Sequence, residues 1–245
     1  RILITGASSG LGAGMARAFA AQGRDLALCA RRTERLEELK AELTEQFPGI
    51  TVAVAALDVN DHDEVPKVFR QLSAELGGLD RVIVNAGIGK GALLGTGKLW
   101  ANKATIETNL VAALVQIETA LELFTAAGSG HLVLISSVLG NKGVPGVKAA
   151  YSASKAGVSS LGESLRAQYR NGPIKVTVLE PGYIESEMTA KTASTPLLVD
   201  NESGVKAMVR AIERETGRAV VPAWPWVPLV WLLRRLPPRY TNRFA

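Results

Sequence analysis

A tyrosine and a lysine four residues apart, in the segment Tyr151-Ser-Ala-Ser-Lys155, have the types and spacing that best predict chemistry in this chain. The surrounding sequence reads as a helix, and residues four apart on a helix lie on one face. A fixed ammonium charge beside a phenol lowers the phenol pKa from about 10 toward neutral pH. Such a phenol can exchange a proton with a carbonyl oxygen. Taken alone, the pattern is also typical of two solvated side chains on a helix surface.

A glycine-rich turn near the start of the chain is the second functional motif. The apolar run 1–5 predicts a buried strand, and the turn Gly6-Ala-Ser-Ser-Gly10-Leu-Gly12 leads into an expected helix. Glycines let the backbone approach a pyrophosphate, and a helix N-terminus offers free N–H groups. The combination predicts a dinucleotide site with contacts from Gly6, Ser8, Ser9, Gly10 and Leu11. A plain β–α turn of small residues is the alternative.

Two arginines follow the second expected strand, 25–30, at the position that separates the two nicotinamide dinucleotides. An acidic residue here would bind the ribose 2′-OH of NAD, whereas an arginine accommodates the 2′-phosphate of NADP. Ala30 ends the strand and Arg31 and Arg32 follow, so the sequence favours NADP. Alternatively, the arginines lie at a solvated strand end and pair with Glu34 or Glu37.

Polar residues also follow the expected strands 51–57 and 80–84. Ligands of open parallel sheets bind beyond the carboxyl ends of the strands. We therefore expect Asp58, with Val59, to contact the adenine, and the segment Asn85-Ala86-Gly87 to combine a structural and a cofactor role. Each segment could instead only form a turn.

Two serines and one asparagine complete the set of candidate residues. The strand 131–135 ends in Ser136-Ser137, where a hydroxyl could bind a substrate carbonyl while Tyr151 protonates it, although two serines often only form a turn. Asn109 lies inside an apolar helical pattern, where asparagine is mildly unfavourable. A buried asparagine at that position would need hydrogen-bond partners.

In this order the motifs resemble those of the short-chain dehydrogenase/reductase family, over roughly residues 1–190. The residues that carry the resemblance are Thr5 to Gly12, Asn85 to Gly87, Asn109, Ser137, Tyr151 to Lys155, and Pro181-Gly182. Together they are highly specific, although no single motif is. The resemblance implies an NADP-dependent oxidoreductase that interconverts a ketone or aldehyde and an alcohol. A non-catalytic dinucleotide-binding regulator with the same fold is the alternative.

The resemblance also assigns roles to individual residues. Tyr151 would be the acid/base, Ser137 would orient the carbonyl with Ser136 as the weaker candidate, and Lys155 would hold the nicotinamide ribose and lower the Tyr151 pKa. Asn109 would anchor a water that relays protons. Near the expected sixth strand, 173–179, the resemblance implies cofactor contacts from Pro181, Gly182, Ile184 and Ser186. A proline turn before a surface helix is the alternative there.

The length and composition fit one α/β domain. Six or seven strands alternate with helices over 245 residues, which predicts a single doubly wound, Rossmann-type domain with a central parallel sheet of about seven strands at 1–221. One cysteine, Cys29, allows no internal disulfide, and two distant histidines make no metal cluster. The net charge of +5 includes no broad basic patch with aromatic residues, which argues against nucleic acid. Because the chain begins inside the first strand without a methionine, we expect residues to precede it.

A tail at 222–245 follows the expected last strand and is rich in Trp, Pro and Arg. Pro222, Pro225 and Pro228 interrupt its apolar stretch, which falls short of the roughly 20 apolar residues that a membrane-spanning helix needs. Leu229–Leu236 can form a short helix. The tail could pack on its own domain or a sister subunit, line the substrate pocket, or rest on a membrane surface through tryptophans and arginines.

Substrate and assembly are predicted only in outline. The loop 88–99 and the segment 195–199, where related enzymes carry a mobile lid, are apolar and lack a basic cluster. A lipophilic carbonyl or alcohol is therefore the expected substrate. The apolar helices at 111–121 and 158–165 favour a homodimer or homotetramer. We expect a cytoplasmic protein, with membrane association through the tail as a further expectation.

Overall fold

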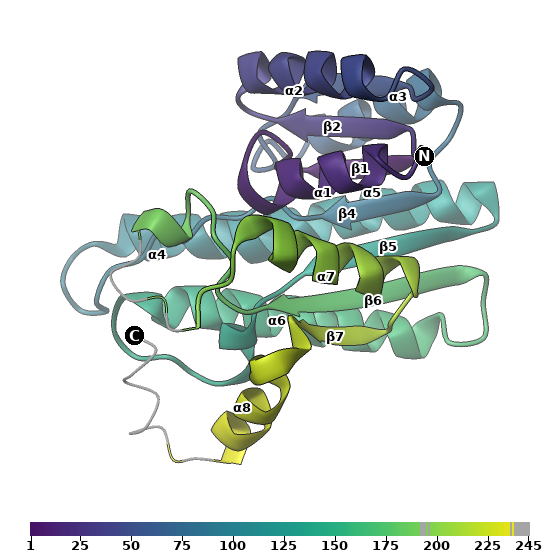
Figure 1. Cartoon of the computed structure of the whole chain (residues 1–245). Coiled ribbons are helices and arrows are strands. Elements are labelled where there is room, and N and C mark those ends of the chain that lie inside the picture. The colour runs from purple at the N-terminus through teal and green to yellow at the C-terminus, as the bar shows by residue number, and fades with distance from the viewer. Residues whose placement is uncertain (192–194, 196, 236, 238–245) are drawn as a thin grey trace.

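The computed structural model describes residues 1–191, 195, 197–235 and 237, and its centre is one parallel sheet of seven strands. The strand order is β3-β2-β1-β4-β5-β6-β7 (Figure 1). The strands are β1 (Ile2–Thr5), β2 (Leu26–Ala30), β3 (Val52–Ala56), β4 (Arg81–Val84), β5 (Gly130–Ile135), β6 (Ile174–Pro181) and β7 (Arg218–Val221). Because the order reverses between β1 and β4, the sheet has the switch point at which doubly wound proteins bind nucleotides. The predicted fold class is confirmed.

Helices cover both faces of the sheet. The α-helices are α1 (Gly10–Ala20), α2 (Thr33–Gln46), α3 (Glu64–Leu76), α4 (Leu99–Ile106), α5 (Ala112–Ala127), α6 (Ala149–Gln168), α7 (Asn201–Glu213) and α8 (Ala223–Arg235). Successive side chains of a strand point to opposite faces. Ile2 and Ile4 accordingly pack in the core beneath α1, α2 and α7, whereas Leu3 lies in the core beneath α3, α5 and α6.

The longest continuous helix runs from Leu99 to Ala127 through α4, a π-helical segment η1 (Glu107–Val111) and α5. Its length of 29 residues and its composition would let it cross a membrane. Its buried residues Ile117 and Phe124 belong to the core against the sheet, so we interpret it as a central helix of this layer. The π-helical segment contains Asn109, and such segments often occur at functional sites.

The tail begins its helix earlier than the sequence predicts. α8 starts at Ala223, although Trp224 has a non-helical backbone, so regular helix begins near Pro225. Proline is tolerated in the first helical turn, where its missing N–H would have no partner. Pro225 lies at the start of the regular helix, and Pro228 lies inside it, three residues further on. Of the expected Leu229–Leu236 helix, Leu236 lies outside the described residues, as does Pro196 of the expected lid segment 195–199.

Candidate active site

The glycine turn between β1 and α1 leaves no room for side chains. A Cβ added at Gly12 would lie 2.4 Å from the Gly6 carbonyl oxygen and 2.8 Å from Asn85 Nδ2. Gly6 has a φ of +65°, which other residues rarely adopt. Ser9 precedes α1 without making a side-chain cap, so the first N–H groups of the helix face outward. This cradle fits the pyrophosphate of a dinucleotide.

Asn85 joins the end of β4 to the glycine turn. Its Nδ2 donates to the Thr5 carbonyl at 2.8 Å, and its backbone N–H donates to Thr5 Oγ1 at 3.0 Å. The N–H of Ala86 donates to the same hydroxyl at 3.1 Å. These bonds hold the turn and the Asn85–Gly87 segment together. They account for the structural half of the role expected of Asn85.

Arg32 reaches from the end of β2 to the glycine turn. Its guanidinium donates to Ser9 Oγ at 2.6 Å and to Ser8 Oγ at 3.2 Å. Arg31 lies 3.9 Å from the Asp58 carboxylate. The alternative expected these arginines to pair with Glu34 or Glu37. In the structure Arg31 instead pairs with Asp58, and Arg32 pairs with Glu187. Asp58 also accepts 3.0 Å hydrogen bonds from Asn60, while Val59 is buried.

Two charged residues of this region were missed by the sequence analysis. Glu187 accepts a 3.0 Å hydrogen bond from Arg32 and a second hydrogen bond from Arg35, in the first turn of α2. The hydrogen bonds from Arg35 and Arg32 lower the pKa of Glu187 to about 2. Arg32 and Arg35 therefore already bind one anionic group. The sequence did offer a signal for Arg35, because it follows closely after Arg31 and Arg32.

Ser137 and Tyr151 meet beyond the end of β5. The Ser137 hydroxyl lies close enough to the Tyr151 phenol to favour its ionised form, and Ser137 Oγ accepts the N–H of Leu139 at 3.2 Å. Ser136 instead points into the fold, where its hydroxyl contacts the Lys155 carbonyl and Ser159 Oγ, both at 2.8 Å. The geometry therefore gives Ser137, rather than Ser136, the position beside the phenol. The long loop after Ser137 forms two short 3-10 helices, η2 (Val138–Asn141) and η3 (Gly146–Lys148).

The pKa of Tyr151 moves opposite to the direction expected from its neighbour Lys155. Burial raises the pKa of the phenol, and the hydrogen bond with Ser137 opposes this only in part. Lys155 is buried and donates to the Ile135 carbonyl at 2.8 Å, and burial lowers its pKa to about 8. In this structure, burial of the phenol therefore outweighs any effect of the ammonium.

Asn109 is buried and fully engaged at the π-helical segment. Its Oδ1 accepts the N–H of Ile88 at 2.8 Å, and its Nδ2 donates to the Ile88 carbonyl at 2.9 Å. A Cβ added at Gly87 would lie 3.2 Å from Asn109 Oδ1 and 3.6 Å from Lys155 Nζ. The segment after β4, the π-helix and α6 therefore converge at Gly87.

The segment after β6 lies against the glycine turn. Ile184 is buried and pairs with Val199, while Ser186 and Thr189 exchange hydrogen bonds of 2.8–3.2 Å. A Cβ added at Gly10 would lie 3.3 Å from Ser186 Cβ, so this segment faces the glycine turn. Thr189 is a further residue that the sequence analysis did not single out.

The tail helix forms part of this side of the site. Trp226 is fully buried and its ring lies 5.8 Å from that of Tyr183, centroid to centroid. Both belong to a small core of their own, which also contains Val138, Leu139, Val144 and Val230. Tyr151 packs against this core. The Tyr183 hydroxyl also accepts a 3.0 Å hydrogen bond from Lys148.

The fold and the arrangement of Ser137, Tyr151 and Lys155 beside a dinucleotide cradle define a dinucleotide-dependent oxidoreductase. A family model for short chain dehydrogenases matches residues 1–197. An uncharacterized oxidoreductase of Mycobacterium tuberculosis is 79% identical over 245 residues, which are 100% of this chain and 97% of that protein. The chain belongs to the short-chain dehydrogenase/reductase family, which uses NAD or NADP.

Solved structures agree with the fold. A short-chain dehydrogenase/reductase of Burkholderia phymatum in complex with NAD superposes with a TM-score of 0.84 at 19% identity, over 95% of this chain and 92% of that one. The NADPH-dependent 3-quinuclidinone reductase of Rhodotorula rubra has a TM-score of 0.78 at 28% identity, over 90% and 88%. Similar folds therefore occur with either dinucleotide.

Proposed function

We propose that this protein is an NADP(H)-dependent oxidoreductase that interconverts a lipophilic ketone or aldehyde and the corresponding alcohol. The observation that carries the proposal is the position of the Ser137 hydroxyl beside the Tyr151 phenol, next to buried Lys155 and the glycine cradle. A dinucleotide bound in this cradle supplies or accepts the hydride. The chain itself must bind the carbonyl oxygen and move one proton.

Tyr151 is placed to move that proton. In the reduction, its hydroxyl donates a proton to the carbonyl oxygen while the Ser137 hydroxyl donates a hydrogen bond to the same atom. The raised pKa keeps the phenol protonated at neutral pH, which is the state a proton donor needs. Lys155, near Gly87 and Asn109, would hold the ribose of the dinucleotide.

The preference for NADP rests on the arginines. No acidic residue ends β2, and Arg32 extends over Ser8 and Ser9 of the glycine turn. A guanidinium there can bind a phosphate with two parallel hydrogen bonds. The pairing of Arg32 and Arg35 with the Glu187 carboxylate supports the proposal, because the same two cations can hold a phosphate.

A lipophilic substrate is proposed from the groups near Tyr151. The small core that packs against Tyr151 is formed mainly by apolar and aromatic side chains. The loop residues Leu93 and Leu94 and the lid residues Leu197 and Leu198 are exposed apolar side chains. The Lys148 ammonium lies over the Tyr183 ring at 5.2 Å, in contact with an aromatic face of this core.

The reaction is tested with Tyr151→Phe and, as a matched control, Tyr169→Phe at the end of α6. A panel of lipophilic ketones and alcohols with NADP(H) first identifies a substrate. We expect Tyr151→Phe to lose turnover by at least about 100-fold, the range of a general acid, and to keep dinucleotide binding. Wild-type turnover of Tyr151→Phe would refute the mechanism.

The cofactor is tested separately by calorimetric titration. Arg32→Ala should weaken NADPH binding by about 1.5–3 kcal/mol, the contribution of a hydrogen bond to a charged group, and leave NADH binding nearly unchanged. Arg24→Ala, whose guanidinium pairs with Glu213 away from the cradle, is the control. Equal affinity of the wild-type protein for NADPH and NADH would refute the NADP assignment.

A further inference from the structure

The helix α8 has apolar residues on two sides, although only one side packs on the protein. Trp226, Val230 and Leu233 are buried against the domain. On the other side, Trp224 is 79% exposed and Trp231 is 59% exposed, with Val227 and Leu232 also exposed. Positions 227 and 231 follow the spacing of one helical face, and Trp224 lies just before the regular helix. Two exposed tryptophans on one short helix leave a large aromatic area in contact with solvent.

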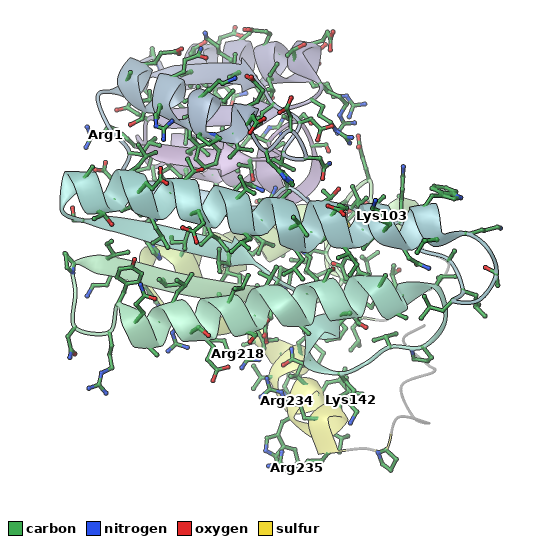
Figure 2. The ribbon with its side chains drawn as sticks, turned by 180° about the vertical axis from the view of Figure 1, so that it is seen from behind. Arg1, Lys103, Lys142, Arg218, Arg234 and Arg235 are labelled. Carbon is green, nitrogen blue, oxygen red and sulfur yellow. The ribbon has the colours of Figure 1, made fainter. Side chains whose placement is uncertain are left out.

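Basic residues surround this outward face. Figure 2 shows Lys142, Arg218, Arg234 and Arg235 gathered around α8. Arg218 is paired with the buried Glu180 at 2.7 Å, so the excess positive charge comes from the other three residues. Residues 222–245 contain four arginines and no aspartate or glutamate.

Arg234 is held against the domain, and Arg235 is held against a tryptophan of the outward face. Arg234 donates to Asn141 Oδ1 at 3.0 Å, and the same oxygen accepts from Arg218 at 2.8 Å. The Arg235 guanidinium lies over the Trp231 ring at 3.9 Å from its centroid. A tryptophan beside an arginine presents an aromatic ring and a cation at the same level. Such a pair matches the interface of a bilayer, where indoles sit among headgroups.

We propose that the outward face of α8 docks on an anionic lipid surface, with Trp224, Val227 and Trp231 at the headgroup level and Arg234 and Arg235 on lipid phosphates. The helix has 13 residues, which is too short to span a bilayer but sufficient to lie in its interface. The docking does not depend on the proposed reaction.

Charge favours a lipid surface over a second copy of the chain. A twofold interface brings the same patch of both copies together. In a twofold dimer formed by this face, Arg234 and Arg235 of one copy would lie near the same arginines of the other copy. The helix α8 contains no acidic residue that could pair with them. An anionic lipid surface supplies the missing negative charge. Each basic residue near such a surface contributes about 1 kcal/mol.

The position of α8 links the docking face to the site. Trp226 and Val230, on the inner side of the helix, belong to the small core against which Tyr151 packs. One helix therefore has the core beside Tyr151 on its inner side and the docking face on its outer side. A protein docked in this way would hold its active site close to the phase in which a lipophilic carbonyl compound dissolves.

The test is flotation of the full chain with phosphatidylcholine vesicles, with and without phosphatidylserine, at low and high salt. We expect binding to the phosphatidylserine vesicles at low salt and release at high salt. Arg234→Gln/Arg235→Gln should lower the partition coefficient by about tenfold or more, as two contributions of about 1 kcal/mol predict. Trp224→Ser/Trp231→Ser should lower binding to the phosphatidylserine vesicles at low salt.

The matched control is Trp100→Ser/Lys103→Gln on α4, which removes an exposed tryptophan and a basic residue elsewhere on the protein. It should bind vesicles like the wild type. Binding reduced equally by this control, or no binding of the wild type at low salt, would overturn the proposal. So would a Trp224→Ser/Trp231→Ser variant that changes from dimer to monomer without any loss of vesicle binding.

A second measurement avoids any change in the helix. Brominated phosphatidylcholine, mixed with phosphatidylserine, should quench the tryptophan fluorescence of Trp100→Ser, in which the remaining tryptophans all lie in 224–231. Quenching by brominated vesicles but not by unbrominated ones supports insertion of these residues. Unchanged fluorescence with bound vesicles would show that another face binds the lipid.

Discussion

The indole of Trp226 lies directly against the backbone of Gly182, because a Cβ added at Gly182 would meet the indole Nε1 at 2.1 Å. Gly182 follows β6, and its N–H donates to the Val221 carbonyl at 2.9 Å, next to the start of α8. The sequence identified Gly182 as a cofactor contact and 222–245 as a tail of open role. In the structure, Trp226 of this tail packs directly on Gly182.

Trp226→Ala should lower the free energy of unfolding by about 3–5 kcal/mol, because it removes a fully buried indole from a small core. It should also lower turnover, because Tyr183 and Tyr151 pack on that core. Chemical denaturation and steady-state kinetics measure the two effects. Trp224→Ala, on the exposed face of the same helix, should stay within about 0.5 kcal/mol of the wild type. Equal stability of the two variants would contradict the packing.

Glu187→Gln should strengthen the binding of NADPH and leave NADH almost unchanged. The Glu187 carboxylate occupies Arg32 and Arg35 and would repel a 2′-phosphate beside them. Removing one exposed like charge corresponds to about 1 kcal/mol, or about a fivefold lower dissociation constant. Titration of both dinucleotides checks this. Glu185→Gln, two residues earlier in the same segment, is the control, and parallel shifts for NADPH and NADH would argue against the idea.

His131 should make stability depend on pH. Burial and the nearby Arg81 charge lower the pKa of its imidazole to about 3, so the folded chain keeps it neutral. Below about pH 6.5 the unfolded chain binds a proton there, and the free energy of unfolding should fall by up to about 1.4 kcal/mol per pH unit toward pH 3. Denaturation at a series of pH values measures the slope. His131→Gln should reduce the slope and His62→Gln should not; identical slopes would refute the assignment.

A homodimer or homotetramer is the expected assembly. An open groove of about 550 Å³ runs between α5 and α6 and is lined by Leu121, Leu165 and Tyr169, among others. Leu165→Glu should therefore lower the mass measured by light scattering at micromolar concentration, whereas Leu94→Glu, in an exposed loop, should not. A monomeric wild-type protein would rule this out.

The fold was readable from the sequence because its signals are local. The strands are short apolar runs, and glycine, asparagine or serine directly follows β1, β4, β5 and β6. The glycine turn, Asn109 and the Tyr151–Lys155 pair also occur in the order that the family requires. Periodicity and order along the chain are sufficient to predict a doubly wound sheet and the positions of its motifs.

The missed features depend on contacts between distant segments. Arg35 and Glu187 lie 152 positions apart, and no local pattern predicts that they meet. The burial of Trp226 depends on the shape of the surface left by Gly182 and Tyr183. The direction of the Tyr151 pKa shift depends on how deeply the phenol is buried, whereas the sequence shows only which charge is its neighbour.

The late position of Trp226 in the chain makes the wall beside Tyr151 the last part of the site to be synthesised. Synthesis proceeds from the N-terminus, whereas a domain generally folds as a unit. The glycine turn and Arg32 are made first, and Trp226 follows every strand of the sheet. A growing chain therefore lacks part of the small core against which Tyr151 packs until it has been extended beyond β7.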